Sequence, residues 1–221
     1  MEFLQSEVAA PLPSRFPSQW SYGYGEYDHT TGRLAGFKSL PHFDSIAWQG
    51  GDMYPDPKLG WLKLDATGGH PGNDLKHAIV RRWTSVNEGD YALVSKISHE
   101  PTAGDGIRAF VCHSESGLLR SATLHHSSEQ INVESIHCKK GDILDFIVDI
   151  RDGLNSDQFL WSARITPLNA IGTKSGGAGG AFVQHDFDAE KDFPIGRDTQ
   201  LNRWQQLAQV LMLANEFMFV D

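Results

Sequence analysis

The stretch "DILDFIVDIRD", residues 142–152, carries the clearest structural pattern in the chain. Successive side chains of a β-strand point to opposite faces, so residues two apart share a face. One parity of this stretch is wholly apolar: Leu144, Phe146, Val148 and Ile150. The other parity is mixed: Ile143, Asp145, Ile147, Asp149 and Arg151. The pattern predicts a strand whose first set faces a core and whose second set, with both carboxylates, faces solvent.

Similar short segments, rich in β-branched and aromatic residues, surround this strand. They are "LKHAIVRRWTS" (75–85), "GDYALVSKISHE" (89–100), "GIRAFVCHS" (106–114), "GLLRSATLHH" (117–126), "INVESIHCKK" (131–140) and "FLWSARITPL" (159–168). Turn signals separate them, such as Gly104-Asp105-Gly106 and Asp152-Gly153. Many short strands with no helical pattern between them are typical of an all-β, antiparallel sandwich or jelly roll. Shorter strands are expected in "FDSIAWQGG" (43–51) and "GWLKLDATGG" (60–69).

Composition divides the 221 residues into four parts. Residues 1–40 read as an irregular lead-in with room for one hairpin, and residues 41–168 as the β-sandwich. Residues 169–197 read as a Gly-rich linker. Residues 198–221 have apolar side chains at helical spacing, with Asp198 or Thr199 as N-cap, and predict a C-terminal amphipathic α-helix that docks on the sandwich or on a partner.

The charge balance and the apolar pattern exclude several classes of protein. The formal net charge of −9 disfavours nucleic acid as a partner, because such binders need clustered Lys and Arg. No apolar run approaches the roughly 20 residues that span a bilayer. The first 20 residues lack the basic start and apolar centre of a signal peptide. Cys112 and Cys138, both in strand-like contexts, are expected to be buried free thiols, with a disulfide as the alternative.

The titratable residues form no recognisable catalytic or metal-binding motif. The pairs His70/His77 and His125/His126 lack the helical spacing or the companion ligands of a zinc site. No nucleophile elbow, phosphate loop or dinucleotide-binding glycine pattern is present. We therefore expect no enzyme activity, no metal site and no cofactor. A structural Ca²⁺ at "DGLNSD", with Asp152, Asn155 and Asp157, stays an open alternative, although the full calcium-loop pattern is missing.

The stretch "WQGGDMYPDPKLGWLKLDATGGHPGND", residues 48–74, places aromatic residues beside glycine and proline, where the backbone can hold a ring away from the scaffold. Neighbouring acid, amide and imidazole groups could bond to sugar hydroxyls. The predicted ligand-binding residues are Trp48, Asp52, Tyr54, Asp56, Trp61, His70, Asn73 and Asp74. Trp83 and Trp161 are expected to fill the core instead, because tryptophan is mostly buried.

Together with "HAIVRRW", "GDGIRAFV" and "KKGDILDFIVDIRDGLNSDQFLW", this stretch resembles a domain of large planctomycete cytochrome-c-linked proteins. Those proteins combine a planctomycete-type haem domain with paired domains of unknown function. The closing "LNRWQQLAQVLMLANEFMFVD" is similar to their C-terminus. The resemblance covers about residues 49–165 and 201–221, and implies an exported, periplasmic parent whose internal β-sandwich looks like a carbohydrate-binding module. Because a CxxCH haem-attachment motif is missing, the chain resembles a C-terminal portion of such a parent.

Two functions follow as expectations. The first is a non-catalytic module that binds polysaccharide or oligosaccharide. The second is a scaffolding domain with no ligand of its own, which holds the neighbouring domains of the parent protein together. In the second, residues 48–74 form a rigid plug with Trp48 and Trp61 buried. Exposure of these two rings separates the alternatives.

Overall fold

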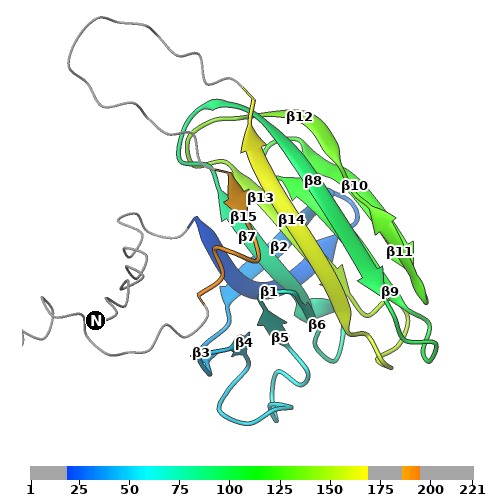
Figure 1. The fold of residues 1–221 in the computed structure, drawn as a ribbon. Helices are drawn as coiled ribbons and strands as arrows, with labels where there is room; N and C mark the ends of the chain where they lie inside the picture. Colours follow the sequence, from blue (N-terminus) through cyan, green and yellow to red (C-terminus); the bar gives the residue numbers. More distant parts are fainter. Residues whose placement is uncertain (1–18, 169–185, 195–221) are drawn as a thin grey trace, which may run out of the picture.

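The computed structural model describes residues 19–168 and 186–194, which form two antiparallel sheets packed face to face (Figure 1). The strands of sheet A, in spatial order, are β10 (Gly117–Leu124), β9 (Ile107–His113), β13 (Ile143–Asp149), β7 (Ala78–Thr84), β1 (Trp20–Asp28) and β2 (Arg33–Ser39). The strands of sheet B are β11 (Ser127–Gln130), β8 (Gly89–His99), β14 (Phe159–Pro167), β6 (Gly68–His70), β5 (Lys63–Asp65), β4 (Ala47–Gln49) and β3 (His42–Phe43). β12 (Val133–Cys138) also pairs with β8, and β15 (Phe187–Asp188) pairs with β14.

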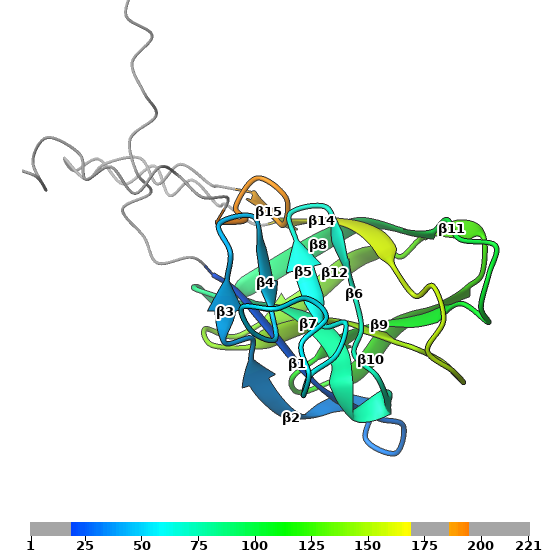
Figure 2. The same cartoon turned by 90° about the horizontal axis from the view of Figure 1, so that it is seen from below.

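This architecture confirms the predicted all-β sandwich. Each of the long segments that the sequence marked as a strand contains one, and the short strands at 43–51 and 60–69 correspond to β4 and β5. Seen from below, the short strands β3 to β6 continue sheet B at one end of the sandwich (Figure 2). A single turn of 3-10 helix, η1 (Leu75–His77), leads from this end into β7.

The core lies between the two sheets, where the apolar parity of β13 was expected to face. Leu144, Phe146 and Val148 are buried there, together with Trp83 and Trp161. The prediction that these two tryptophans fill the core is confirmed. Cys112 and Cys138 are buried and unpaired, and burial raises the pKa of each thiol to about 12.

The other face of β13 is not solvated, and this part of the prediction was wrong. Asp145 accepts two hydrogen bonds from Arg82, at 2.7 and 2.8 Å, and Asp149 accepts two from Arg108, both at 2.9 Å. Only 6% of Asp145 and 2% of Asp149 are exposed. Alternation cannot distinguish a solvated face from one where charges are buried as two-bond ion pairs.

A second apolar cluster covers this outer face of sheet A. Its buried members are Tyr27, Ala78, Val80, Phe110, Cys112 and Ile147, with Leu34 and Phe37 packed against them. The Arg82 guanidinium lies 3.9 Å from the centroid of the Phe37 ring. Gly23 makes room for that ring, because a Cβ there would come within 2.5 Å of it.

Two of the predicted domain boundaries need correction. Residues 1–40 were expected to be an irregular lead-in with room for one hairpin. β1 and β2 form such a hairpin, but it belongs to the sandwich, because β1 pairs with β7 from Trp20↔Trp83 to Gly25↔Ala78. The sandwich therefore begins before residue 41. That this hairpin joins the sandwich was missed because its glycines and tyrosines weaken the alternation.

Within the predicted linker, residues 186–194 pack on the sandwich. β15 pairs with β14, and Phe193 is buried 4.8 Å from the ring of Tyr22. Trp20 Nε1 donates to Asp192 at 3.3 Å. The predicted C-terminal helix, 198–221, and the rest of the linker lie outside the described residues.

Candidate binding groove

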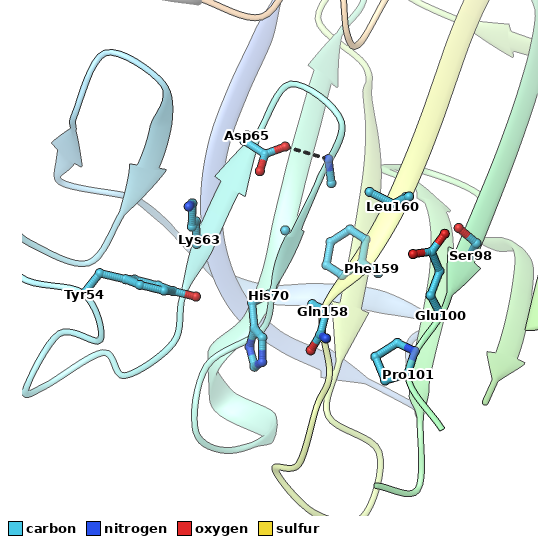
Figure 3. A pocket seen from close by; sticks show the side chains of 12 residues that line it. Tyr54, Lys63, Asp65, His70, Ser98, Glu100, Pro101, Gln158, Phe159 and Leu160 are labelled. Atoms are coloured by element: carbon cyan, nitrogen blue, oxygen red, sulfur yellow. Dashed lines mark hydrogen bonds between the residues drawn. The ribbon is translucent and has the colours of Figure 1, made fainter. Parts of the chain in front are cut away.

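A groove with a volume of about 510 Å³ crosses the outer face of sheet B (Figure 3). Its walls come from four neighbouring strands and the loops next to them. The lining residues are Tyr54, Lys63, Asp65, Gly68, Gly69, His70, Ser98, Glu100, Pro101, Gln158, Phe159 and Leu160. We call this the sheet groove.

Two glycines form its floor. A Cβ on Gly68 would lie 1.9 Å from the carbonyl oxygen of Phe159, and one on Gly69 would lie 2.3 Å from that of Lys63. Since real Cβ atoms do not approach backbone oxygens so closely, only glycine lets β6 lie this near to β5 and β14. At these two positions β6 consequently presents backbone and no side chain to the groove.

The turn from β5 to β6 is held from two sides. Asp65 Oδ1 accepts hydrogen bonds from the backbone N–H and hydroxyl of Thr67 and from the N–H of Gly68, each at 2.9 Å. The dashed line at Asp65 in Figure 3 marks the last of these. From the core, Arg81 Nη2 donates to the carbonyl oxygen of Asp65 at 2.7 Å. These bonds fix the edge of the sheet groove.

An aromatic pair lies at one end of the sheet groove. The rings of Tyr54 and Trp61 meet edge to face, with centroids 5.5 Å apart, and the Tyr54 hydroxyl donates to the Trp61 carbonyl oxygen at 3.3 Å. Tyr54 is 41% exposed and Trp61 is 40% exposed. The rings therefore hold each other in place while keeping a large part of their surface open to solvent.

The polar groups of the sheet groove are mostly hydrogen-bond acceptors. Lys63 is the single cation among its lining residues, against the carboxylates of Asp65 and Glu100. The Lys63 ammonium lies 5.3 Å from the centroid of the Tyr54 ring, within cation–π range.

His70 adds a further acceptor. Its Nδ1 lies 2.7 Å from the carbonyl oxygen of Pro71, and because a carbonyl only accepts, Nδ1 carries the proton. Burial lowers the pKa of this imidazole and so favours the neutral ring. Nε2 is then left with its lone pair.

The structure brings together three of the eight predicted binding residues. Tyr54 and His70 line the sheet groove, and Trp61 adjoins both, its ring centroid 5.8 Å from that of His70. Trp48 lies on the opposite side of sheet B. It pairs with Leu64, a core residue, and its ring stacks on Tyr22 with centroids 6.1 Å apart.

The remaining four predicted residues do not line the sheet groove. Asp56 accepts hydrogen bonds from the N–H groups of Lys58 and Leu59 and so closes a turn inside the loop. Asp74 caps η1 by accepting from the N–H of Lys76. Asn73 packs against Gly60, where a Cβ would lie 2.0 Å from its Oδ1. Asp52 is exposed in the loop.

Sequence reasoning missed Lys63, Asp65, Ser98, Glu100 and Gln158. The first two carried a usable signal, because Trp61, Lys63 and Asp65 share one parity of an expected strand. Glu100 and Gln158 carried none: β8 and β14 pair across a separation of some sixty residues, from Leu160↔Ser98 onward.

No group of three or more His, Cys, Asp or Glu side chains within residues 19–168 and 186–194 could hold a metal ion. At the open calcium alternative, Asp157 is buried and accepts from the N–H of Asn155, whereas the Asp152 side chain is 81% exposed. Among the described residues, no helix is long and apolar enough to cross a membrane.

Comparisons with known proteins add only distant likenesses. No family model matches the chain, and no curated protein does. A family 35 carbohydrate-binding module from an environmental isolate is 16% identical, over 56% of this chain and 86% of that one, with a TM-score of 0.29. Rabbit GITRL is 14% identical, over 55% and 94%, with a TM-score of 0.32. The PA14 domain of the MpAFP antifreeze protein is 10% identical, over 83% and 95%, with a TM-score of 0.30.

Identities and TM-scores this low carry no argument about ligand or activity. The fold and the groove define the described residues as a two-sheet β-sandwich domain, with an aromatic-flanked groove on one sheet that is lined by both polar and apolar groups. Its function is inferred from that groove alone.

Proposed function

We propose that this domain binds glycan, without chemical turnover, in the sheet groove. The observation that carries the proposal is the pair Tyr54 and Trp61, each about two-fifths exposed beside a cleft lined by polar and apolar groups. A pyranose ring has an apolar C–H face that packs on an aromatic ring, and hydroxyl groups that need donors and acceptors. The sheet groove offers both kinds of contact within one concave surface.

The test is retention on polysaccharides in affinity gels and on a glycan array. Wild-type protein should be retained, and Tyr54→Ala and Trp61→Ala should lose retention. Val94→Ala is the matched control, because Val94 is 63% exposed on the same sheet and does not line the groove. If the wild-type protein is retained by no polysaccharide, the proposal is wrong.

The absence of turnover is part of this proposal, and it rests on the two carboxylates of the groove. A glycosidase needs one carboxyl held protonated by its surroundings and a second one across the bond to be cleaved. Asp65 is occupied by the turn that it caps, and Glu100 is exposed to solvent. Incubation with the retained polysaccharide should release no reducing ends. Release that Glu100→Gln abolishes would show an enzyme instead.

The resemblance to planctomycete cytochrome-c-linked proteins supports a wider setting for the same proposal, in which the domain belongs to a larger exported, haem-linked protein. An antibody against the domain should then detect a large polypeptide that stains for haem, in the periplasmic fraction of a planctomycete. Detection in the cytoplasm of only a 24.5 kDa polypeptide, the mass of this chain, would contradict that setting.

The scaffolding alternative draws on a different observation. Asp56 and Asp74 brace the loop between Trp48 and Asp74, and Trp48 packs into the core, as a plug would require. Trp61 is not buried, which is the opposite of what that alternative predicts. Scaffolding would be favoured if wild-type protein and Tyr54→Ala pulled down the parent's haem domain equally well. The wild-type protein should then also show no retention on glycan.

A further inference from the structure

We propose, building on the glycan-binding function, that the sheet groove takes an uncharged glycan chain of several linked rings, with contacts to Tyr54 at one end and Leu160 at the other. The predicted ligand is longer than one ring and carries no acidic groups. The span of the groove, its two exposed apolar side chains and its charges favour such a ligand.

The span follows from the strand order. β5, β6, β14 and β8 are successive neighbours in sheet B, and each of them contributes lining residues. Neighbouring strands lie about 4.8 Å apart, so the groove extends about 14 Å from β5 to β8. A single pyranose ring would fill only part of that distance, and a short oligosaccharide would fill it all.

Exposed apolar side chains lie on both sides of the glycines of β6, at Tyr54 and at Leu160. Tyr54 lies on one side, beyond β5, and Leu160 lies on β14 toward the other side, beside Glu100 and Ser98 (Figure 3). Leu160 is 44% exposed, on the outer face of β14. Between them lie the glycine floor, His70 and Gln158. A chain across the strands would place one ring on Tyr54 and another on Leu160.

The charges of the groove disfavour acidic sugars. One ammonium, that of Lys63, stands against the carboxylates of Asp65 and Glu100, and it already lies over the Tyr54 ring. A uronate or sulfate would therefore meet a net negative surface, where like charges repel. Because the turn engages only Oδ1 of Asp65, sugar hydroxyls can instead donate to Asp65 Oδ2, to Glu100 and to His70 Nε2, and accept from Gln158 and Lys63.

The experiment is isothermal titration of the full chain with two sets of probes. The neutral set consists of cello-, xylo-, manno- and laminari-oligosaccharides of increasing length, from a single sugar to a tetrasaccharide. The acidic set consists of oligogalacturonates of the same lengths. The variants are Tyr54→Ala, Leu160→Ala and the control Val94→Ala.

For the neutral series that binds, affinity should rise with length. Leu160→Ala should weaken tetrasaccharide binding about fivefold, which corresponds to roughly 1 kcal/mol, and should leave the single sugar unchanged. Tyr54→Ala should weaken both, and Val94→Ala neither. Oligogalacturonates should bind more weakly than every neutral tetramer that binds.

Two results would overturn this inference while leaving the glycan-binding function intact. One is a single sugar that binds as tightly as its tetramer, with tetramer affinity unchanged in Leu160→Ala. The other is preferred binding of oligogalacturonate that depends on Lys63, shown by its loss in Lys63→Met. Failure of every probe of both sets, together with no retention on polysaccharide, would overturn the function as well.

Discussion

Arg81 of β7 reaches across the core from sheet A and donates from Nη2 to the backbone carbonyl oxygen of Asp65 in sheet B, 2.7 Å away. Nη1 donates to the carbonyl oxygen of Trp161 at 3.4 Å. The side chain is buried, and burial lowers its pKa. Among its hydrogen bonds to described residues, all acceptors are backbone carbonyls. A core cation is thus used to fix the turn beside the sheet groove.

Replacing Arg81 should loosen the turn from β5 to β6 and destabilise the folded domain. Arg81→Met keeps much of the apolar volume but leaves buried carbonyls without a donor, so we expect unfolding to become easier by about 1–3 kcal/mol. Urea unfolding measures the loss. Hydrogen exchange at the amides of Thr67 and Gly68 should also accelerate.

Arg164→Met is the matched control for that prediction. Arg164 forms an ion pair with Asp188 on the outer surface, with its side chain 51% exposed. A surface pair contributes little, so the control should change stability by less than about 1 kcal/mol. Equal effects of the two variants would contradict the role assigned to Arg81.

Gly68→Ala should separate β6 from β14. The added Cβ would lie 1.9 Å from the Phe159 carbonyl oxygen, a backbone atom that cannot rotate away. We expect a loss of stability of about 1–3 kcal/mol from the forced backbone shift, and with it a loss of glycan retention. Gly153→Ala, where nothing lies within 4 Å of the new Cβ, should be close to neutral in thermal unfolding.

Asp157 should make the domain less stable as pH rises. Burial raises the pKa of this carboxyl from 3.8 to about 6, and its Oδ1 is buried without a hydrogen-bond partner among the described residues. The folded protein therefore binds this proton more tightly than the unfolded chain does. The stabilisation is complete below about pH 4 and is lost as pH rises through 6.

Asp157→Asn removes the charge and keeps the oxygen that accepts from the N–H of Asn155. It should match wild type near pH 3.5 and exceed it by about 1–3 kcal/mol at pH 7.5. Unfolding by urea at both pH values checks the sign. A variant less stable than wild type at pH 7.5 would show that the native site favours the carboxylate.

Trp61 should account for the quenchable fluorescence of the described domain. Trp20, Trp83 and Trp161 are almost fully buried, and Trp48 packs on the core. Because Trp204 lies outside the described residues, the measurement uses a Trp204→Phe background. Adding Trp61→Phe should remove most of the acrylamide-accessible emission. In the background protein that keeps Trp61, a bound oligosaccharide should protect this ring from quenching. Quenching that persists without Trp61 would place the exposed indole elsewhere.

Much of the fold was predictable because the information is local. The wholly apolar parity of residues 144–150 and the turn residues between segments specify strands and their inner faces. The start of the sandwich was placed too late because glycines such as Gly23 weaken the alternation of β1, and its partner, β7, lies far along the chain. The solvated face of β13 was predicted wrongly because the partners of Asp145 and Asp149 come from other strands.

The sequence by itself determined the class of fold, the buried tryptophans and the loop that carries Tyr54 and Trp61, since period-two alternation and turn chemistry act within a few residues. Tertiary structure determined the groove. The pairing of β6 with β14 and of β14 with β8 brings His70, Gln158 and Glu100 to one surface, and the pairing of β4 with β5 turns Trp48 away from it. Which residues share a surface depends on strand order and register, and these are set by contacts between distant segments.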